Sequence, residues 1–218
     1  MDSSKKTEYK IIVARYNENI NWINDDNRIV YNKGSFLDNS IPLKNVGREA
    51  DTYLHYIITN YDNLPDVVVF TQGSIAQHNG ETRRDDLNYL LRLKDEALVH
   101  GKTLPKPGWV CNSVSKNSNC FDPEWNKDPN EKWYLSDNYK NNEHVLFIDW
   151  FKEHINSEYP NPITIYWAAI FAVRRDYILK NPLEYYKKLL LECNYHSEPI
   201  EAHFLERSWY YIFDDNQR

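Results

Sequence analysis

A run of four apolar residues, Val67 to Phe70, constrains the fold of this chain more than any other feature. The run does not alternate with polar residues, so a strand here is buried on both faces, as in a parallel sheet covered by helices. An amphipathic segment begins just before it at Glu49. Its apolar residues recur at three- and four-residue steps: Ala50, Tyr53, Leu54, Ile57 and Ile58. A helix followed by a doubly buried strand predicts an α/β fold.

Other segments extend the pattern into a mostly parallel central sheet flanked by helices. The strands are expected at 10–15, 28–31, 66–71 and 163–173. Amphipathic spacing predicts further helices at 83–98, 145–154, 182–193 and 199–213. A short helix is expected to start at 20–23, and a turn or helix at 174–179. Residues 101–142 form a long irregular insertion that contains Trp109, Trp125 and Trp133, and an irregular segment of this length is typically a lid or binding loop.

Length and composition fit one intracellular domain over residues 1–218. A chain of 218 residues buries a full core without cross-links. Its net charge of −6, with both signs interspersed, argues against nucleic acid as a partner. No apolar segment is long enough for a membrane span or placed as a signal peptide, so we expect a soluble, cytoplasmic protein. The three cysteines lack a CxxC spacing and are expected to be reduced, with a Cys111–Cys120 pair as the alternative.

Polar residues follow the predicted strands at their carboxyl ends. Asn17 and Glu18 follow the first strand, and Gln72 and Gly73 follow the doubly buried one, with His78 shortly after. Ligands of open α/β sheets bind outside these ends, which predicts a ligand crevice. The alternatives are an idle crossover loop, a helix-capping role for Asn17 and Glu18, and a structural His78.

A turn at Asn45 to Gly47 places Arg48 just before the amphipathic helix. An arginine there can bind a phosphate together with the backbone N–H groups of the turn. The alternative is an ion pair with Glu49 or another neighbour. Arg83 and Arg84 could also neutralise a diphosphate, although a solvated helix face is the favoured interpretation of that pair.

Three motifs together resemble nucleotide-sugar glycosyltransferases with the GT-A fold. They are IIVARYNE at 11–18, NVGRE at 45–49, and the pairing of AAIFAVRRDYIL at 168–179 with EAHFLERSW at 201–209. The motifs cover most of the chain, and the whole pattern also resembles an uncharacterised family of unknown function. The resemblance implies a Rossmann-like sheet and transfer of a sugar from a nucleotide-sugar donor to a glycan or glycoprotein acceptor, as a hexosyl- or pentosyltransferase.

Two other functions remain open. The first is a catalytically inactive relative that binds glycans or proteins. The second is an unrelated hydrolase built on His78 and a carboxylate, which is the least supported because the chain has no G-x-S-x-G motif.

The resemblance also implies roles for individual residues. The donor nucleotide and its phosphates would contact Asn17, Glu18, Arg48, Gln72, Gly73 and His78. An inverting transferase needs a carboxylate that takes the acceptor proton, and Glu201 is chosen because it is near the start of its helix, with His203 as a second group. Glu206 projects about 140° away from Glu201 on that helix, so we interpret Glu206 and Arg207 as a structural ion pair.

One position departs from the GT-A pattern. Members of that superfamily carry an Asp-x-Asp that holds a divalent metal, Mn²⁺ or Mg²⁺, whereas this chain has Thr71 to Ser74 there, without a carboxylate. Asp85 and Asp86 could bind a metal, but acidic residues also suit a helix start.

We predict that Glu18, Arg48, Gln72 and His78 line one cleft, without a metal at the usual position. The segment from Trp109 to Trp133 is expected to roof part of this cleft.

Overall fold

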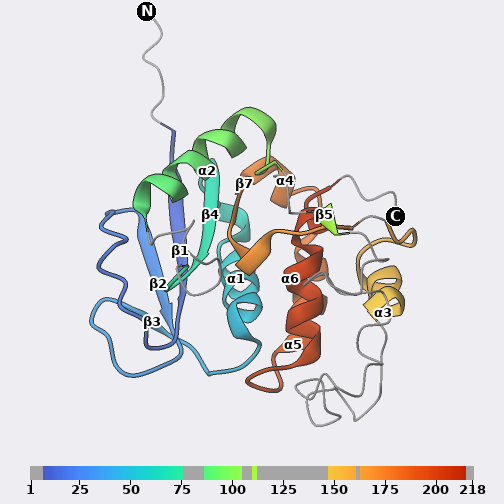
Figure 1. The fold of residues 1–218 in the computed structure, drawn as a ribbon, viewed down its shortest axis with the longest axis horizontal. Helices are drawn as coiled ribbons and strands as arrows, with labels where there is room; N and C mark the ends of the chain where they lie inside the picture. The colour runs from blue at the N-terminus through green and yellow to red at the C-terminus, as the bar shows by residue number, and fades with distance from the viewer. Residues whose placement is uncertain (1–6, 76–85, 105–109, 112–146, 161–162, 215–218) are drawn as a thin grey trace, which may run out of the picture.

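The computed structural model describes residues 7–75, 86–104, 110–111, 147–160 and 163–214, and it shows an α/β fold. Five strands form a mixed sheet in the order β3-β2-β1-β4-β7, in which the first four strands are parallel and β7 is antiparallel to β4 (Figure 1). The strands are β1 (Tyr9–Arg15), β2 (Arg28–Asn32), β3 (Ile41–Pro42), β4 (Val67–Gln72) and β7 (Phe171–Arg174). A separate two-stranded sheet pairs β5 (Val110–Cys111) with β6 (Ile163–Thr164).

Six α-helices surround the sheet in the described part of the chain. They are α1 (Arg48–Thr59), α2 (Leu87–His100), α3 (Phe147–His154), α4 (Arg175–Ile178), α5 (Leu183–Cys193) and α6 (Ile200–Ile212). Figure 1 shows α2 on one side of the sheet, with α1 and α6 on the other. No helix among the described residues has both the length and the apolar character needed to cross a membrane.

The doubly buried strand predicted from the sequence is β4. Val68 and Phe70 pack into the core cluster formed with α1, α5 and α6. Val67 and Val69 point to the opposite face and pack with Leu93 and its neighbours on α2. Successive side chains of a strand alternate between faces, so a strand between two helical layers must be apolar at every position.

Aromatic rings fill the core between the sheet and α6. The ring centroids of Tyr53 and Phe70 lie 4.8 Å apart, and those of Phe171 and Trp209 lie 5.5 Å apart. Ring pairs at such separations contribute about 0.5–1.5 kcal/mol beyond the burial of their area. Much of the aromatic content of the chain therefore stabilises the fold.

Strand order reverses at β1, which pairs with β2 on one side and with β4 on the other. The chain first continues outward from β1 through β2 to β3. It then crosses back through α1 and enters the sheet again as β4 on the opposite side of β1. Such a reversal leaves a crevice at the carboxyl ends of the two strands that flank it, which here are β1 and β4.

Three details differ from the sequence-based expectations. The strand predicted at 163–173 is interrupted: β6 is followed by a short 3₁₀ segment (Trp167–Ala169) before β7, and Ala168 and Ala169 have φ values of 58° and 51°. Residues 20–23 form a turn instead of a helix, closed by the bond from Ile23 N to Ile20 O at 3.0 Å. The short strand β3 forms at Ile41–Pro42, where no strand was expected.

Both outer edges of the five-stranded sheet are short or covered. At one edge, β3 has only two residues, and the second is Pro42. At the other edge, the segment after α2 runs along β7. There Thr103 N donates to Ala172 O at 2.9 Å, and Lys102 forms a bridge with Val173.

Candidate functional site

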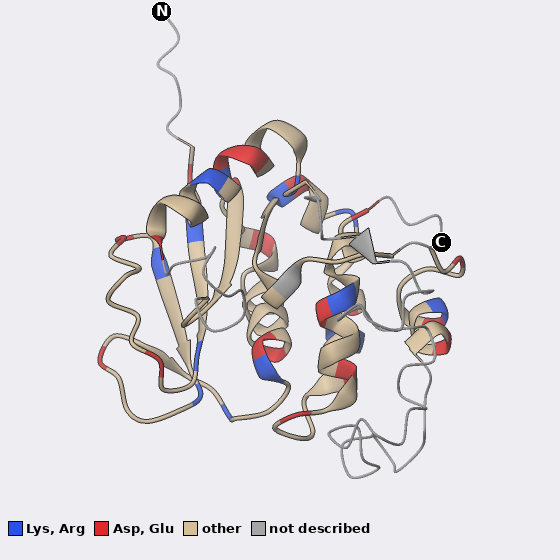
Figure 2. Cartoon of the chain, in the orientation of Figure 1, with Lys and Arg blue, Asp and Glu red and all other residues tan. Residues whose placement is uncertain are grey.

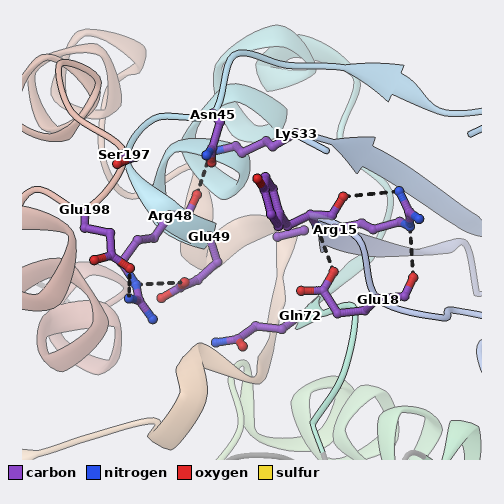
Figure 3. Close-up of a pocket in the computed structure, with 11 residues that line it drawn as sticks. Arg15, Glu18, Lys33, Asn45, Arg48, Glu49, Gln72, Ser197 and Glu198 are labelled. Atoms are coloured by element: carbon purple, nitrogen blue, oxygen red, sulfur yellow. Dashed lines mark hydrogen bonds and ion pairs between the residues drawn. The ribbon is translucent and has the colours of Figure 1, made fainter. Parts of the chain in front are cut away.

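A pocket of about 400 Å³ opens at the carboxyl ends of β1 and β4. Its walls come from these two strands, from the loops after β1 and β2, from the start of α1 and from the loop between α5 and α6 (Figure 3). The lining residues are Ala14, Arg15, Tyr16, Glu18, Lys33, Asn45, Arg48, Glu49, Gln72, Ser197 and Glu198. The pocket thus lies at the place where the strand order reverses.

Three of the four residues predicted to share one cleft line this pocket: Glu18, Arg48 and Gln72. The fourth, His78, lies outside the described residues. Gly73 adjoins the pocket floor, where its N–H donates to Ala14 O at 2.9 Å.

The loop after β1 is fixed from both sides. Asn17 Oδ1 accepts bonds from the backbone N–H and the hydroxyl of Ser35 at 2.8 and 2.7 Å, and Glu18 Oε2 accepts from Tyr16 N at 2.7 Å. Asn17 therefore joins two loops, and Glu18 braces its own loop; neither of these bonds caps a helix.

Lys33 holds the turn that carries Arg48. Its side chain is 5% exposed, and its ammonium group lies 2.7 Å from Asp51 Oδ2. It also donates to the carbonyl oxygens of Val46 at 2.5 Å and of Arg48 at 2.6 Å. These charged hydrogen bonds connect the end of β2 to the first turn of α1, and so fix where the side chain of Arg48 begins.

The turn held by Lys33 is left-handed at two successive residues. Gly47 has φ 63° and Arg48 has φ 50°. Glycine adopts this conformation freely, whereas it costs a residue such as arginine roughly 1–2 kcal/mol. Strained backbone positions of this kind occur preferentially at functional sites. The bonds from Lys33 offset the strain and keep Arg48 at the pocket wall.

The guanidinium of Arg48 is only loosely paired within the protein. Its Nε lies 3.7 Å from Glu49 Oε2 and its Nη1 lies 3.5 Å from Glu198 Oε1, as Figure 3 shows. Arg48 Nε and Glu49 Oε1 are buried and have no hydrogen-bond partner in the described part of the chain. The ion pair that was the alternative interpretation of Arg48 is therefore present, but it leaves hydrogen-bonding capacity at the pocket.

Electrostatics also distinguish Glu49. Burial raises the pKa of its carboxyl group, and nearby Glu206 raises it further, whereas Arg48 opposes the shift. Figure 2 shows acidic and basic residues adjoining at the start of α1. A buried acid with a raised pKa in a pocket is typical of functional sites.

The other two cations of the pocket are held by the protein itself. Arg15 Nη1 donates to Asn32 Oδ1 at 2.7 Å and its Nε donates to Glu18 O at 3.0 Å, while Lys33 makes the bonds described above. Among the described lining residues, Arg48 is therefore the cation best placed to meet an anionic ligand.

A family model described as "Protein of unknown function (DUF3431)" matches residues 11–218. The chain belongs to the DUF3431 family. Comparison with curated proteins and with solved structures gave no significant match. The predicted kinship with an uncharacterised family is confirmed, and the DUF3431 match spans every residue that lines the pocket.

The predicted catalytic groups of this DUF3431 chain lie on α6 and are not among the pocket-lining residues. Glu201 is 3% exposed and accepts a bond from the hydroxyl of Tyr195 at 2.6 Å. His203 is 9% exposed, and its pKa is well below the usual range because of burial and the charges of Arg48 and Arg207. Their catalytic roles stay predictions.

The predicted structural ion pair on α6 is confirmed. Arg207 Nη1 lies 2.9 Å from Glu206 Oε2, and both side chains are largely buried.

The described residues of the DUF3431 chain do not fit a divalent metal. At the position of the missing Asp-x-Asp, Gln72 Nε2 donates to Ala168 O at 2.9 Å. No group of three or more His, Cys, Asp or Glu residues is arranged to hold a metal ion in this part of the chain. Asp86 is the N-cap of α2 and accepts a bond from Asn88 N at 2.8 Å, which confirms its interpretation as a helix start.

Several other predictions fall on residues that the structure does not describe. They concern Arg83, Arg84, Asp85, Cys120 and the tryptophans at 109, 125 and 133. Cys193 is described, and it is a free, buried thiol.

The lowered pKa of His203 predicts a specific pH dependence of stability. Since the unfolded chain takes up the proton more readily, the free energy of unfolding should fall as the pH drops below about 6.5, the ordinary value for histidine. The slope for one proton reaches at most about 1.4 kcal/mol per pH unit. Urea denaturation of the wild-type chain and of His203→Gln between pH 5 and 8 measures this pH dependence of the free energy of unfolding. The wild-type chain should lose stability relative to His203→Gln as the pH falls, and parallel curves would contradict the prediction.

Proposed function

We propose that this chain is a glycosyltransferase that binds a nucleotide-sugar donor in the pocket and transfers the sugar to a glycan or glycoprotein acceptor. The observation that carries the proposal is the position of the pocket at the reversal of strand order, with Arg48 presented at the start of α1. Nucleotides bind at this position in open α/β sheets. A helix N-terminus also favours negative charge, which suits a diphosphate.

The lining residues suggest how a donor would lie. Arg48 would bind the diphosphate, because its guanidinium is held only loosely by Glu49 and Glu198. Glu198 is 65% exposed and can yield its place to a phosphate. Glu18 and Gln72 would then face the nucleoside or the sugar from the ends of β1 and β4. A volume of about 400 Å³ is within the range of small-molecule sites.

In the proposed reaction, an acceptor oxygen attacks the anomeric carbon while the bond from that carbon to the diphosphate breaks. Arg48 would stabilise the negative charge that develops on the leaving phosphate. The predicted proton acceptors, Glu201 and His203, lie outside the pocket lining. The geometry therefore supports donor binding more directly than it supports the proton transfer.

One observation favours a second candidate, an inactive relative that binds glycans or proteins. Gln72 stands where GT-A enzymes carry a metal-binding aspartate, and its amide is used to hold the backbone of Ala168. Such a protein could keep the pocket without catalysing transfer. Binding of a nucleotide sugar without its hydrolysis or transfer to any glycan tested would favour this candidate.

Arg48→Ala tests donor binding. We expect the affinity for UDP, GDP, UDP-glucose or GDP-mannose, whichever the wild-type chain binds, to fall at least about tenfold, because a charge-assisted contact to phosphate is lost. Alanine meets a similar backbone penalty at φ 50°, but Tm should fall moderately because the buried Glu49 loses its cation. Calorimetric titration and a thermal scan measure both quantities.

Lys187→Ala is the matched control, because it removes one positive charge from an exposed pair with Glu184 on α5. Its affinity should equal that of the wild type. If Arg48→Ala binds as well as the wild type does, Arg48 does not hold the phosphate. If the wild-type chain binds none of the four compounds, the proposed function is wrong.

A further inference from the structure

Glu49 lines the pocket and has a buried carboxylate oxygen that makes no hydrogen bond with the described residues. Its side chain is 6% exposed, and that oxygen is its Oε1. Buried polar atoms in folded proteins are nearly always hydrogen-bonded, so an exception requires an explanation. At a pocket wall, a donor group of a bound ligand would supply the missing bond.

The long ion pair with Arg48 involves Oε2 of this acid and leaves its Oε1 without a hydrogen-bond partner in the described part of the chain. Asp51, two residues further along α1, is also buried and its Oδ1 also has no hydrogen-bond partner among the described residues, but Lys33 lies 2.7 Å from its Oδ2 and Asp51 does not line the pocket. The nearest cation to Glu49 is Arg48, at 3.7 Å. Burial and the charge of Glu206 raise the pKa of Glu49, whereas the charge of Arg48 opposes the shift and favours the carboxylate form. The fold therefore keeps a buried carboxyl group with an unsatisfied oxygen, which is unfavourable for stability, at the site where a ligand is expected.

The surrounding charges restrict what that ligand can carry next to its phosphate. Three carboxyl groups line the pocket, those of Glu18, Glu49 and Glu198, whereas Arg15 and Lys33 are occupied by protein acceptors. With Arg48 bound to the diphosphate, a second anionic group on the ligand would meet carboxylates without a free cation among the described lining residues. Repulsion between these carboxylates and a second anionic group would weaken the binding of such a ligand.

We propose that Glu49 accepts a hydrogen bond from a hydroxyl group of the donor sugar and selects uncharged sugars over uronates. The inference rests on the proposed function. In a nucleotide sugar, the sugar is bonded directly to the phosphate that Arg48 would hold, so a sugar hydroxyl lies close to the neighbouring residue Glu49. A hydroxyl group satisfies the free Oε1, whereas a sugar carboxylate cannot donate and is repelled.

The experiment compares donors that differ only at one carbon of the sugar. UDP-glucose with UDP-glucuronate, and GDP-mannose with GDP-mannuronate, are titrated calorimetrically into the wild-type chain, together with UDP and GDP alone. We expect the uncharged sugar of the accepted nucleotide to bind at least about tenfold more tightly than its uronate, a difference of about 1.4 kcal/mol. In Glu49→Gln this ratio should shrink severalfold, because the repulsion is removed.

Two variants separate this role from a structural one. Glu49→Gln should keep or raise Tm, since it removes a buried ionisable group, whereas a structural acid would lower Tm when replaced. Glu184→Gln, which changes an exposed acid on α5, should leave both Tm and the donor ratio unchanged.

The outcomes distinguish the two proposals. If UDP or GDP binds but the uronate binds as well as the uncharged sugar, the selectivity assigned to Glu49 is wrong and the proposed function stands. The same conclusion follows if the ratio persists undiminished in Glu49→Gln. If no nucleotide or nucleotide sugar binds to the wild-type chain, the proposed function fails and this inference fails with it. A wild-type ratio near one overturns the selectivity even if a variant does not fold.

Discussion

Gly34→Ala should lower the free energy of unfolding by about 3 kcal/mol or more, as severe overpacking does. A Cβ at Gly34 would lie 1.6 Å from the carbonyl oxygen of Tyr16 and 2.4 Å from its carbonyl carbon. Both are backbone atoms, so no side chain can rotate away to make room. Lys33 N donates to Arg15 O at 2.9 Å next to this contact. Separating the two loops would therefore break a backbone hydrogen bond at the end of β1 and β2.

Urea denaturation of the variant and the wild type measures this loss. Gly73→Ala is the matched control, because its Cβ would meet only side-chain atoms, Glu18 Oε2 at 2.8 Å and Glu18 Cβ at 3.0 Å, so the crowding is milder than at Gly34. The control should lose less than about 1 kcal/mol, within the range of ordinary substitutions. Equal unfolding midpoints for Gly34→Ala and the wild type would show that the two loops separate easily.

Lys33→Met should destabilise the protein by about 3–5 kcal/mol, the usual result of removing one partner of a buried ion pair. Asp51 is 1% exposed and would keep its charge in the interior without the ammonium group that lies 2.7 Å away. The carbonyl oxygens of Val46 and Arg48 would also lose their donor. The left-handed turn at Gly47 and Arg48 would then lack the bonds that offset its strain.

The double variant Lys33→Met with Asp51→Asn is the control for the charge. Because it leaves no unpaired carboxylate, it should recover a substantial part of the lost stability in urea denaturation. Its nucleotide affinity should nevertheless stay as low as that of Arg48→Ala, because Lys33 positions Arg48. If the double variant binds nucleotide like the wild type, Lys33 contributes to stability only.

The sequence was most informative where burial leaves few choices. The strands β1, β2 and β4 and the helix α1 were predictable because each of these strands has a run of consecutive apolar residues and the amphipathic helix shows its period. The interruption of the strand before β7 could not be predicted. Residues 163–173 are strongly apolar, and nothing in their sequence marks the positive φ values of Ala168 and Ala169. The strand β3 has two residues and exists through its pairing with β2, which is a tertiary effect.

Some residues of the candidate site could also be predicted from the sequence, and others could not. Glu18, Arg48 and Gln72 were found because polar residues after parallel strands and before helices gather at one edge. Lys33 follows β2 and could have been found by the same rule. Glu198 comes from the loop between α5 and α6, which reaches the pocket because Gly47 N bonds to His196 O at 2.8 Å. No local pattern marks a contact between residues so far apart in the sequence.

The edges of the five-stranded sheet bear on how this protein behaves at high concentration. An exposed edge strand can pair with a strand of another molecule and begin aggregation. Here β3 offers two residues, and Pro42 has no N–H group to donate. On the opposite side, the residues after α2 already bond to the backbone of β7. Among the described strands of this sheet, neither edge provides a long, free template, so association by strand addition is disfavoured even when the chain is crowded.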